Sequence, residues 1–232
     1  YLSNLGLSTW AIFRGSAINT EKLSKQNLTR FLVLVGIIFA GEIVFSLPFH
    51  IARFFRPTFL EVFALSNTQL GDIFAVYGVI AMLAYFPGGL IADRFPARNL
   101  MAFSLMATAL GGLYLYSTPG DLGLKLLFGY WGVTSILLFW GAMIKATREW
   151  GASDAQGLAF GLLDGGRGFV ASLFASIAVL ILVISVGAQT GNAEGLGKVI
   201  LFYSFATALG GLVIWLLLPS NSAGPSSIQL TP

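Results

Sequence analysis

Residues 73–92 read IFAVYGVIAMLAYFPGGLIA, a run of twenty residues without a charged side chain that is bounded by Asp72 and Asp93. A helix needs roughly 20 apolar residues to cross the ~30 Å hydrocarbon core of a membrane. In lipid, a single segment satisfies all of its backbone N–H and C=O groups only as a helix. The run therefore predicts a transmembrane helix.

Five other stretches have similar length and apolar character, and residues 199–218 are also free of charge. The six predicted spans are 31–54, 71–92, 99–118, 124–144, 158–188 and 199–218. Of the 232 residues 56% are apolar and 10% charged, whereas a soluble domain carries about 25% charged residues. The sequence predicts an all-α integral membrane protein with six transmembrane helices. It excludes a disordered chain, an ordinary cytosolic enzyme and a secreted disulfide-rich domain.

Residue counts narrow the chemistry further. The chain has no cysteine and a single histidine, His50, so neither a thiolate site nor a zinc signature with two histidines is available. We therefore expect no metal and no cofactor. The net charge of +3 fits the excess of Lys and Arg that membrane proteins carry on their cytoplasmic side, and we expect no nucleic-acid partner.

The basic residues predict the orientation of the spans. With both termini in the cytoplasm, eight Lys and Arg residues lie inside and four outside. The inside residues are Arg14, Lys22, Lys25, Arg30, Arg94, Arg98, Lys145 and Arg148, and the outside residues are Arg53, Arg56, Lys125 and Lys198. Residues 1–30, which mix polar and aromatic side chains, form a cytoplasmic or interfacial segment. The Ser- and Pro-rich residues 219–232 form a flexible cytoplasmic tail.

Two local signals refine the helices. Ser66 and Gln69 stand at the spacing of a capping box, which predicts the start of the second helix. Pro48 lies inside the first span and removes one helical hydrogen bond, which predicts a kink near Val44.

Glu42 lies near the middle of the first span, about eleven residues or ~16 Å from its start. A charge at that depth costs ~3 kcal/mol, so Glu42 should face a wet cavity, pair with a cation or stay protonated. Ser46, His50 and Arg53 follow at helical spacing, which predicts one polar face. Such a face could bind an ion or release a proton. Alternatively, Glu42 makes a structural hydrogen bond to a neighbouring helix, and the side chains of His50 and Arg53 extend to the membrane–water interface.

A second charged set lies in the fifth span, where Asp164 and Arg167 are three residues apart. Arg167 is ~15 Å from Gly157, again near the middle of the membrane. It is either a hook for an anion that competes with Glu42 or Asp164, or part of a permanent pair that holds the first and fifth helices together. The sequence leaves both alternatives open.

Glycines recur along the same span, at Gly157, Gly161 and Gly165 and then at Gly168. A stripe of small residues lets another helix approach closely in a membrane. We expect this stripe to be a helix-packing face.

The loop after the second span reads GLIADRFPAR over residues 89–98. It resembles the loop motif G-x-x-x-D-R-x-G-R-R of the major facilitator superfamily, which Gly89, Asp93, Arg94 and Arg98 match. Pro96 and Ala97 depart from the motif. By its chemistry, Gly89 allows a close helix approach, and Asp93 could pair with Arg98 as a latch that closes one conformation and opens in another. The alternative is a solvated loop that only sets topology.

The resemblance extends to residues 85–89 and 159–168, which are similar to an uncharacterised bacterial branch of the superfamily, distantly related to organic-anion and sugar-phosphate carriers. It implies that the chain is a 3+3 inverted repeat, the first half of a twelve-helix transporter, and that 219–232 begins its central linker. The partner would be a missing C-terminal six-helix half, with a second copy of the chain as the alternative. In that family the first and fourth helices line the cavity, which makes Trp131 and Thr134 candidate substrate contacts, with packing as the alternative.

These observations predict half of a secondary active transporter that moves a small polar, anionic solute across the inner membrane by alternating access, with proton-coupled symport. The alternatives are a non-transporting six-helix scaffold and a dimerising half-carrier. An enzyme is not expected, because the chain has neither an H-E-x-x-H motif nor a serine in the context of an intramembrane protease.

Overall fold

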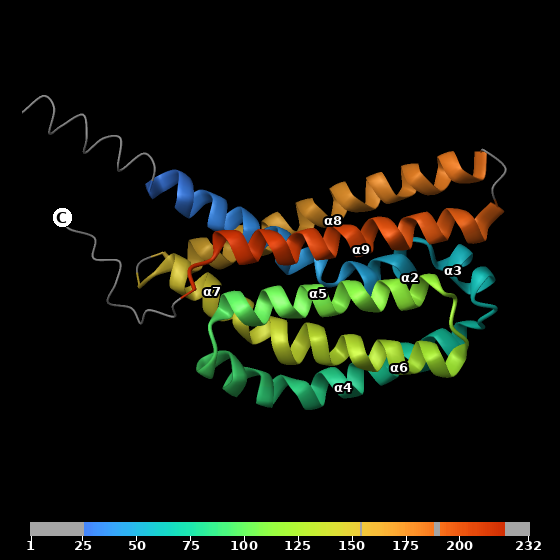
Figure 1. Ribbon diagram of the computed structural model, residues 1–232, viewed down its shortest axis with the longest axis horizontal. Helices are drawn as coiled ribbons and strands as arrows, with labels where there is room; N and C mark the ends of the chain where they lie inside the picture. Colours follow the sequence, from blue (N-terminus) through green and yellow to red (C-terminus); the bar gives the residue numbers. More distant parts are fainter. Residues whose placement is uncertain (1–25, 154, 188–190, 221–232) are drawn as a thin grey trace, which may run out of the picture.

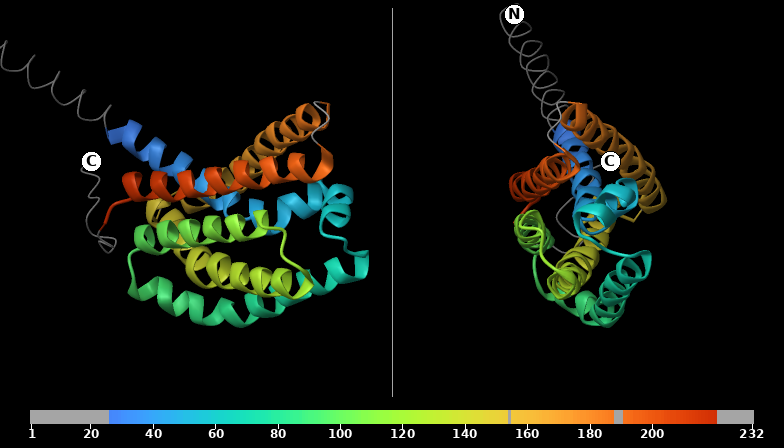
Figure 2. Two further views of the ribbon diagram at one scale, coloured as in Figure 1. Left: turned by 45° about the vertical axis from the view of Figure 1, so that its right-hand side comes forward. Right: turned by 90° about the vertical axis from the view of Figure 1, so that its right-hand side faces the viewer.

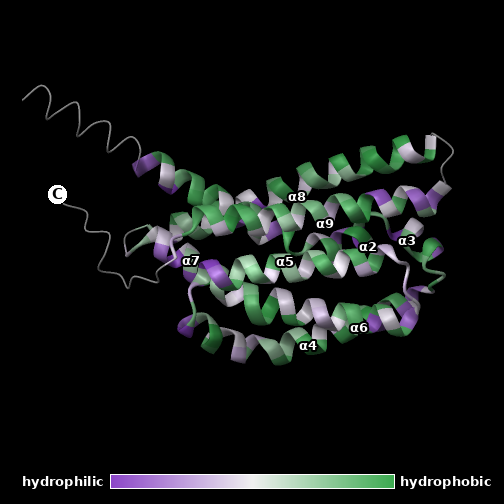
Figure 3. Cartoon of the chain, viewed as in Figure 1, coloured by the Kyte–Doolittle hydropathy of each residue, from purple (hydrophilic) through white to green (hydrophobic). Residues whose placement is uncertain are grey.

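The computed structural model describes residues 26–153, 155–187 and 191–220. These residues are almost entirely helical, with no strand among them, and they contain six helices that are long and apolar enough to cross a membrane (Figure 1). The prediction of an all-α protein with six transmembrane helices is confirmed. Hydropathy follows the same layout, because apolar residues dominate the middle of the spans and hydrophilic residues gather mainly at their ends (Figure 3).

Each predicted span coincides with one observed span. The first is Gln26–Phe54, with a π-helix η1 (Ser46–His50) and α2 (Ile51–Phe54) at its end. The others are α4 (Asn67–Arg94), α5 (Ala97–Tyr116), the continuous series α6 (Asp121–Gly132), η2 (Val133–Trp140) and α7 (Gly141–Gly151), then α8 (Gln156–Gly187) and α9 (Gly191–Leu217). A short helix that was not predicted, α3 (Arg56–Val62), follows the first span.

The first span begins earlier than the sequence predicts, so residues 26–30 belong to a membrane helix rather than to the N-terminal segment. The rest of that segment, 1–25, and most of the predicted tail, 221–232, lie outside the described residues. The described chain starts and ends at the same end of the bundle, as six alternating spans require (Figure 1).

The backbone of the first span becomes irregular where Pro48 predicts it. The helix is regular to residue 43, after which Phe45 N donates to Glu42 O at 3.0 Å, one residue closer than in an α-helix. The wider turn η1 then carries the chain past Pro48, which has no N–H to donate. Figure 1 shows the resulting change of direction between the start of the span and α2. The capping box at α4 is also confirmed, with Ser66 N donating to Gln69 Oε1 at 2.8 Å and Gln69 N to Ser66 Oγ at 3.2 Å.

The six spans cover one another unequally. Viewed along the helices, α5 and α9 form one side of the bundle, and α8 and α4 lie on the opposite side (Figure 2). In the most apolar stretch of each helix, 56% of residues are buried in the first span, but only 22% in α4 and 11% in α8. The helices α4 and α8 therefore leave the largest part of their surface uncovered within the described chain.

Glycines bring helices together at positions that differ from the predicted ones. A Cβ at Gly157, Gly161, Gly165 or Gly168 would meet nothing within 4 Å, so the stripe on α8 packs against no described residue. The contact is made instead by Gly166, where a Cβ would lie 2.7 Å from Ile38. The stripe lies on the uncovered surface of α8, so its role as a helix-packing face stays a prediction that concerns a partner beyond the described residues.

Candidate functional site

An ionic cluster joins the first span to α8 inside the bundle. Glu42 Oε1 lies 3.0 Å from His50 Nε2, and Glu42 Oε2 accepts a hydrogen bond from Arg167 Nε at 3.1 Å. The side chains of Glu42 and His50 are 12% and 8% exposed, and that of Arg167 is 20% exposed. We call Glu42, His50 and Arg167 the buried cluster.

The irregular backbone of the first span assembles one half of this cluster. In a straight α-helix, positions 42 and 50 would be ~12 Å apart along the axis. The tight bond at Phe45 and the π-helix that ends at His50 replace that geometry. Across this irregular segment the imidazole contacts the carboxylate directly, and His50 is buried rather than extended to the membrane interface.

The other half of the cluster depends on the surroundings of Arg167. Its guanidinium lies 5.7 Å from the ring centroids of both Phe45 and Trp140, at the outer limit of cation–π contact. Gly41 leaves room for the side chain, because a Cβ there would meet Arg167 Cδ at 3.4 Å and Met143 Sδ at 2.8 Å. The sequence did not single out Trp140, since its position next to Arg167 depends on the contact between η2 and α8.

Asp164 occupies a different environment from Glu42. Its Oδ1 lies 3.7 Å from Arg167 Nη1, and its side chain is 75% exposed. Glu42 is therefore the close partner of Arg167. Asp164 lies eight residues, or ~12 Å, from the start of α8, where a carboxylate in contact with lipid is costly, so it needs water or a partner beyond the described residues. If His50 is neutral, the carboxylates of Glu42 and Asp164 and the guanidinium of Arg167 together carry a net charge of −1.

The remaining candidates from the first and fourth helices do not join the cluster. Ser46 Oγ donates to Ile43 O at 2.6 Å and contacts Thr207 Oγ1 of α9 at 3.3 Å, so the predicted common face is divided between two neighbouring helices. The break after residue 43 accounts for this division. Arg53 is exposed and lies over the ring of Phe54.

Trp131 and Thr134 lie in the contact between the fourth span and α5. Trp131 is fully buried and its Nε1 donates to Thr108 O at 3.1 Å. Thr134 Oγ1 accepts a hydrogen bond from Thr108 Oγ1 at 2.8 Å, and Thr134 O accepts one from Ser104 Oγ at 2.6 Å. Both side chains are thus engaged in packing. Their helical spacing showed that they share a face, but not which neighbour that face meets.

The loop between α4 and α5 differs from the predicted latch. Among the described residues no ion pair joins Asp93 to Arg98, whose guanidinium stacks on the ring of Trp215 at 4.1 Å. Asp93 and Arg94 are exposed. The end of α4 is held by Lys145 of α7, which donates to Ala92 O at 2.9 Å and to Phe95 O at 3.3 Å.

The close helix approach expected at Gly89 occurs at the preceding residue. A Cβ at Gly89 would meet nothing within 4 Å, whereas one at Gly88 would lie 3.0 Å from Leu137 O. Gly141 makes the reciprocal contact, since its Cβ would lie 3.1 Å from Gly88 O. Only one of the two adjacent glycines faces η2 and α7, and the motif does not show which one.

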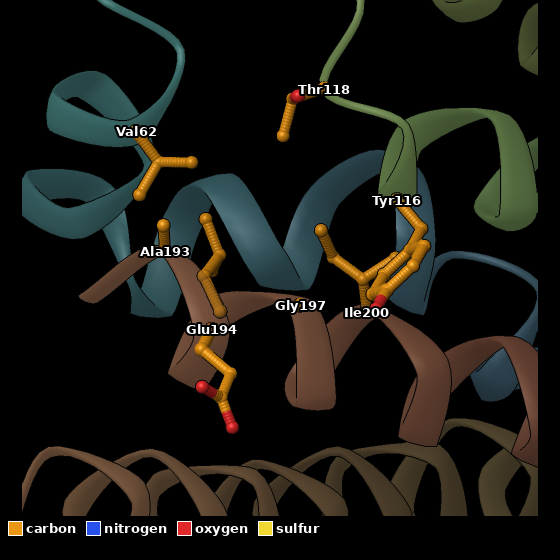
Figure 4. Close-up of a pocket in the computed structure, with 8 residues that line it drawn as sticks. Val62, Tyr116, Thr118, Ala193, Glu194, Gly197 and Ile200 are labelled. Atoms are coloured by element: carbon orange, nitrogen blue, oxygen red, sulfur yellow. The ribbon is translucent and has the colours of Figure 1, made fainter. Parts of the chain in front are cut away.

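A small cavity of about 220 Å³ lies at the far end of the bundle, between α3, the end of α5 and the start of α9 (Figure 4). Val62, Tyr116 and Glu194 are among its lining residues. It includes no member of the buried cluster. Within the described residues, no group of three or more His, Asp or Glu side chains could hold a metal ion.

The fold defines the class of protein: the chain is an all-α, multi-pass membrane protein. It is 30% identical over 204 residues to the inner membrane protein YihN of Escherichia coli, a match that covers 88% of this chain and 47% of the relative. It is 28% identical over 200 residues to the inner membrane protein YqcE of the same organism, covering 86% of this chain and 46% of the relative. An uncharacterised protein of Mycoplasma pneumoniae is 22% identical over 204 residues.

The chain thus spans about half the length of the curated relatives that it matches. No protein-family profile matches the chain. No solved structure matches it either. The names of the relatives state a membrane location and no substrate.

Proposed function

We propose that the chain is the first six-helix half, a 3+3 inverted repeat, of a major facilitator superfamily transporter in the cell inner membrane, with both termini in the cytoplasm. It carries a small polar anion by alternating access together with a proton. The observation that carries the proposal is the buried cluster. Glu42 lies near the middle of the first span, Arg167 lies eleven residues into α8, and an exposed carboxylate, Asp164, lies beside them.

Charge placement argues for a functional cluster over a purely structural one. Ionisable side chains within membrane spans are rare, face protein or water, and mark ion and substrate paths. Glu42 and Arg167 neutralise each other, so the pair alone has a structural explanation. Asp164 has none, because its side chain is 75% exposed and its nearest cation is 3.7 Å away. An aqueous path beside α8 supplies the environment that Asp164 needs.

The contacts support a specific coupling of proton and anion. When Glu42 takes up a proton, its attraction for Arg167 falls, and the guanidinium is free to bind an anion. His50, which already bonds to the other carboxylate oxygen, can exchange that proton with Glu42. A monovalent anion and a proton then enter together with no change in the net charge of the cluster. When both leave, Glu42 and Arg167 pair again.

The uncovered surfaces of α4 and α8 support a second six-helix half. Both helices lie on the side of the bundle opposite to α5 and α9 (Figure 2), and the relatives are about twice as long as the matched part. A second half placed there would enclose Asp164 and the glycine stripe of α8 between the two bundles. A dimer of half-carriers would do the same, whereas a non-transporting scaffold requires no aqueous path.

Accessibility of Asp164 tests the proposal. The chain has no cysteine, so Asp164→Cys introduces a unique thiol into this half. In the full-length protein, with any cysteines outside this chain removed, a membrane-impermeant maleimide should label this thiol in sealed vesicles. Phe205→Cys is the control for a lipid-facing position, because Phe205 is 71% exposed at the middle of α9, on the side of the bundle opposite to α8. Equal protection of both positions from either side would remove the aqueous path and favour the scaffold.

Proton coupling needs a separate measurement. Proteoliposomes with a trapped pH dye are exposed to small phosphorylated sugars and carboxylates one at a time. The wild-type protein should take up protons with at least one anion, Glu42→Gln should abolish that uptake, and Arg167→Gln should abolish the response to the anion. Glu194→Gln, which removes an exposed carboxylate of α9, should leave both responses unchanged. Uptake that survives Glu42→Gln would contradict the coupling.

A further inference from the structure

An apolar groove runs along the outer side of the bundle between α5 and α9. Its volume is about 620 Å³, within the ~300–1,000 Å³ range of small-molecule sites. The lining residues are Asn99, Ala102, Phe103, Met106, Phe205, Ala208, Leu209, Gly211, Leu212 and Trp215. Asn99 is the one residue among them with an amide side chain, and it stands at the end of the groove next to Arg98.

The length of the groove matches one leaflet of a bilayer. Along α9 it extends from Trp215, two residues before the end of the helix, to Phe205 near the middle, a distance of ~15 Å at 1.5 Å per residue. Half of a ~30 Å hydrocarbon core is also ~15 Å. A transmembrane helix of another protein or of a second copy would need a complementary strip along the whole span. The groove instead ends at the depth where an acyl chain ends.

A cation marks the headgroup end of the groove. The guanidinium of Arg98 lies 4.1 Å from the ring centroid of Trp215, which lines the groove. Arg98 Nε is buried and has no hydrogen-bond partner among the described residues. Arg94 and Arg98 outnumber Asp93 where α4 ends and α5 begins, so this junction carries a net positive charge. An interfacial tryptophan beside a cation is the arrangement found where helices meet lipid headgroups.

We infer that this groove is a binding site for an anionic phospholipid. One acyl chain lies between α5 and α9, with its phosphate against Arg98 and the amide of Asn99. The phosphate supplies an acceptor for the guanidinium of Arg98, and guanidinium–phosphate contacts are among the strongest charge-assisted hydrogen bonds. The site is on the side of the bundle opposite to α8, so it is independent of the transport proposal and requires only the membrane fold (Figure 2).

Native mass spectrometry of the full-length protein tests the site. The protein is reconstituted with an equimolar mixture of phosphatidylglycerol and phosphatidylethanolamine, and the lipid that survives extraction is counted. The wild type should retain phosphatidylglycerol preferentially, and Arg98→Gln should lower that retention about tenfold, the effect of ~1.4 kcal/mol. Arg94→Gln is the matched control, because it removes an exposed arginine of the same loop, and it should change retention less than twofold.

Two further variants separate lipid binding from a structural role of Arg98. Arg98→Lys keeps the charge and should keep most of the retention, even though it weakens the stack on Trp215. Ala208→Phe fills the groove without touching the loop, and it should displace phosphatidylglycerol while the unfolding temperature stays unchanged. Equal losses with Arg94→Gln and Arg98→Gln, or full retention with Ala208→Phe, would overturn the inference. So would disulfide-linked dimers of Leu212→Cys in native membranes, which would place a second copy in the groove.

Discussion

The contact between Glu42 and Arg167 should contribute a large coupling energy that only a double-mutant cycle reveals. At 3.1 Å and an effective dielectric constant of ~20, the attraction between the two charges is about 5 kcal/mol before desolvation. Glu42→Gln or Arg167→Gln alone leaves one buried charge without its partner, at a cost of ~3–5 kcal/mol. The double variant removes both charges and should be no less stable than either single variant. We expect a coupling free energy of about 3 kcal/mol.

A second ion pair in the same chain serves as the control. Glu194 Oε1 and Lys198 Nζ are 2.8 Å apart, closer than the buried pair, but their side chains are 55% and 46% exposed. An exposed pair at this spacing on a helix contributes only ~0.3–0.5 kcal/mol. If distance alone decided the coupling, the surface pair would be the stronger. If burial decides it, the Glu42–Arg167 pair will be stronger by several fold.

Equilibrium unfolding of the full-length protein in lipid bicelles, followed by tryptophan fluorescence, measures both cycles. Hydrogen bonds between membrane helices average ~0.6 kcal/mol in such cycles. A coupling for Glu42 and Arg167 at or below that value would refute the assignment of a buried ion pair. It would mean that Glu42 is protonated in the resting protein, or that water screens the contact.

Three further outcomes follow from the helix contacts of α4. Gly88→Ala should destabilise the protein by ~1–3 kcal/mol, because the new Cβ would press on a carbonyl of η2. Gly89→Ala has open space around it and should be neutral in the same unfolding assay. Equal effects of the two variants would contradict the contact. Tyr77→Phe loses a buried 2.7 Å hydrogen bond to η2 and should cost ~1 kcal/mol, while Tyr85→Phe, at an exposed position, should cost nothing measurable by thermal unfolding. Lys145→Met frees two carbonyls at the end of α4 and should speed amide hydrogen exchange there, and unchanged exchange would show that the lysine is not the cap.

The number and type of helices were predictable because hydrophobic length is a property of the sequence alone. A single segment of twenty uncharged residues satisfies all of its backbone hydrogen bonds in lipid only as a helix, without help from its neighbours. The ends were less certain, since residues 26–30 are polar enough to resemble a loop and become helical as part of the first span. The irregular backbone before Pro48 was also predictable, because it follows from a missing N–H group.

Partners across helices were not predictable from spacing. The sequence placed Glu42 and Arg167 at similar depth and offered two partners for the arginine, and the structure shows Glu42 as the closer. It paired Asp93 with Arg98 because they are close in the chain, but the stacking partner of Arg98 is Trp215, more than a hundred residues away. Which of two adjacent glycines touches a neighbour depends on the rotation of a helix about its axis. A single sequence does not contain that rotation.

The position of the two π-helices adds an argument that the buried cluster is more than a structural clasp. π-Helices are rare, form mostly as local bulges within α-helices, and occur often at functional sites. The two segments of this kind among the described residues are η1, which ends at His50, and η2, which ends at Trp140. His50 contacts Glu42, and Trp140 contacts Arg167, so both irregular turns end at the same ion pair. A permanent ion pair between two helices gains nothing from weaker backbone hydrogen bonding on both sides of it. An ion pair that opens and closes needs neighbouring helices whose backbone can change conformation. Regular α-helical hydrogen bonding at both segments in a structure of the full-length protein, with the Glu42–Arg167 pair intact, would remove this argument.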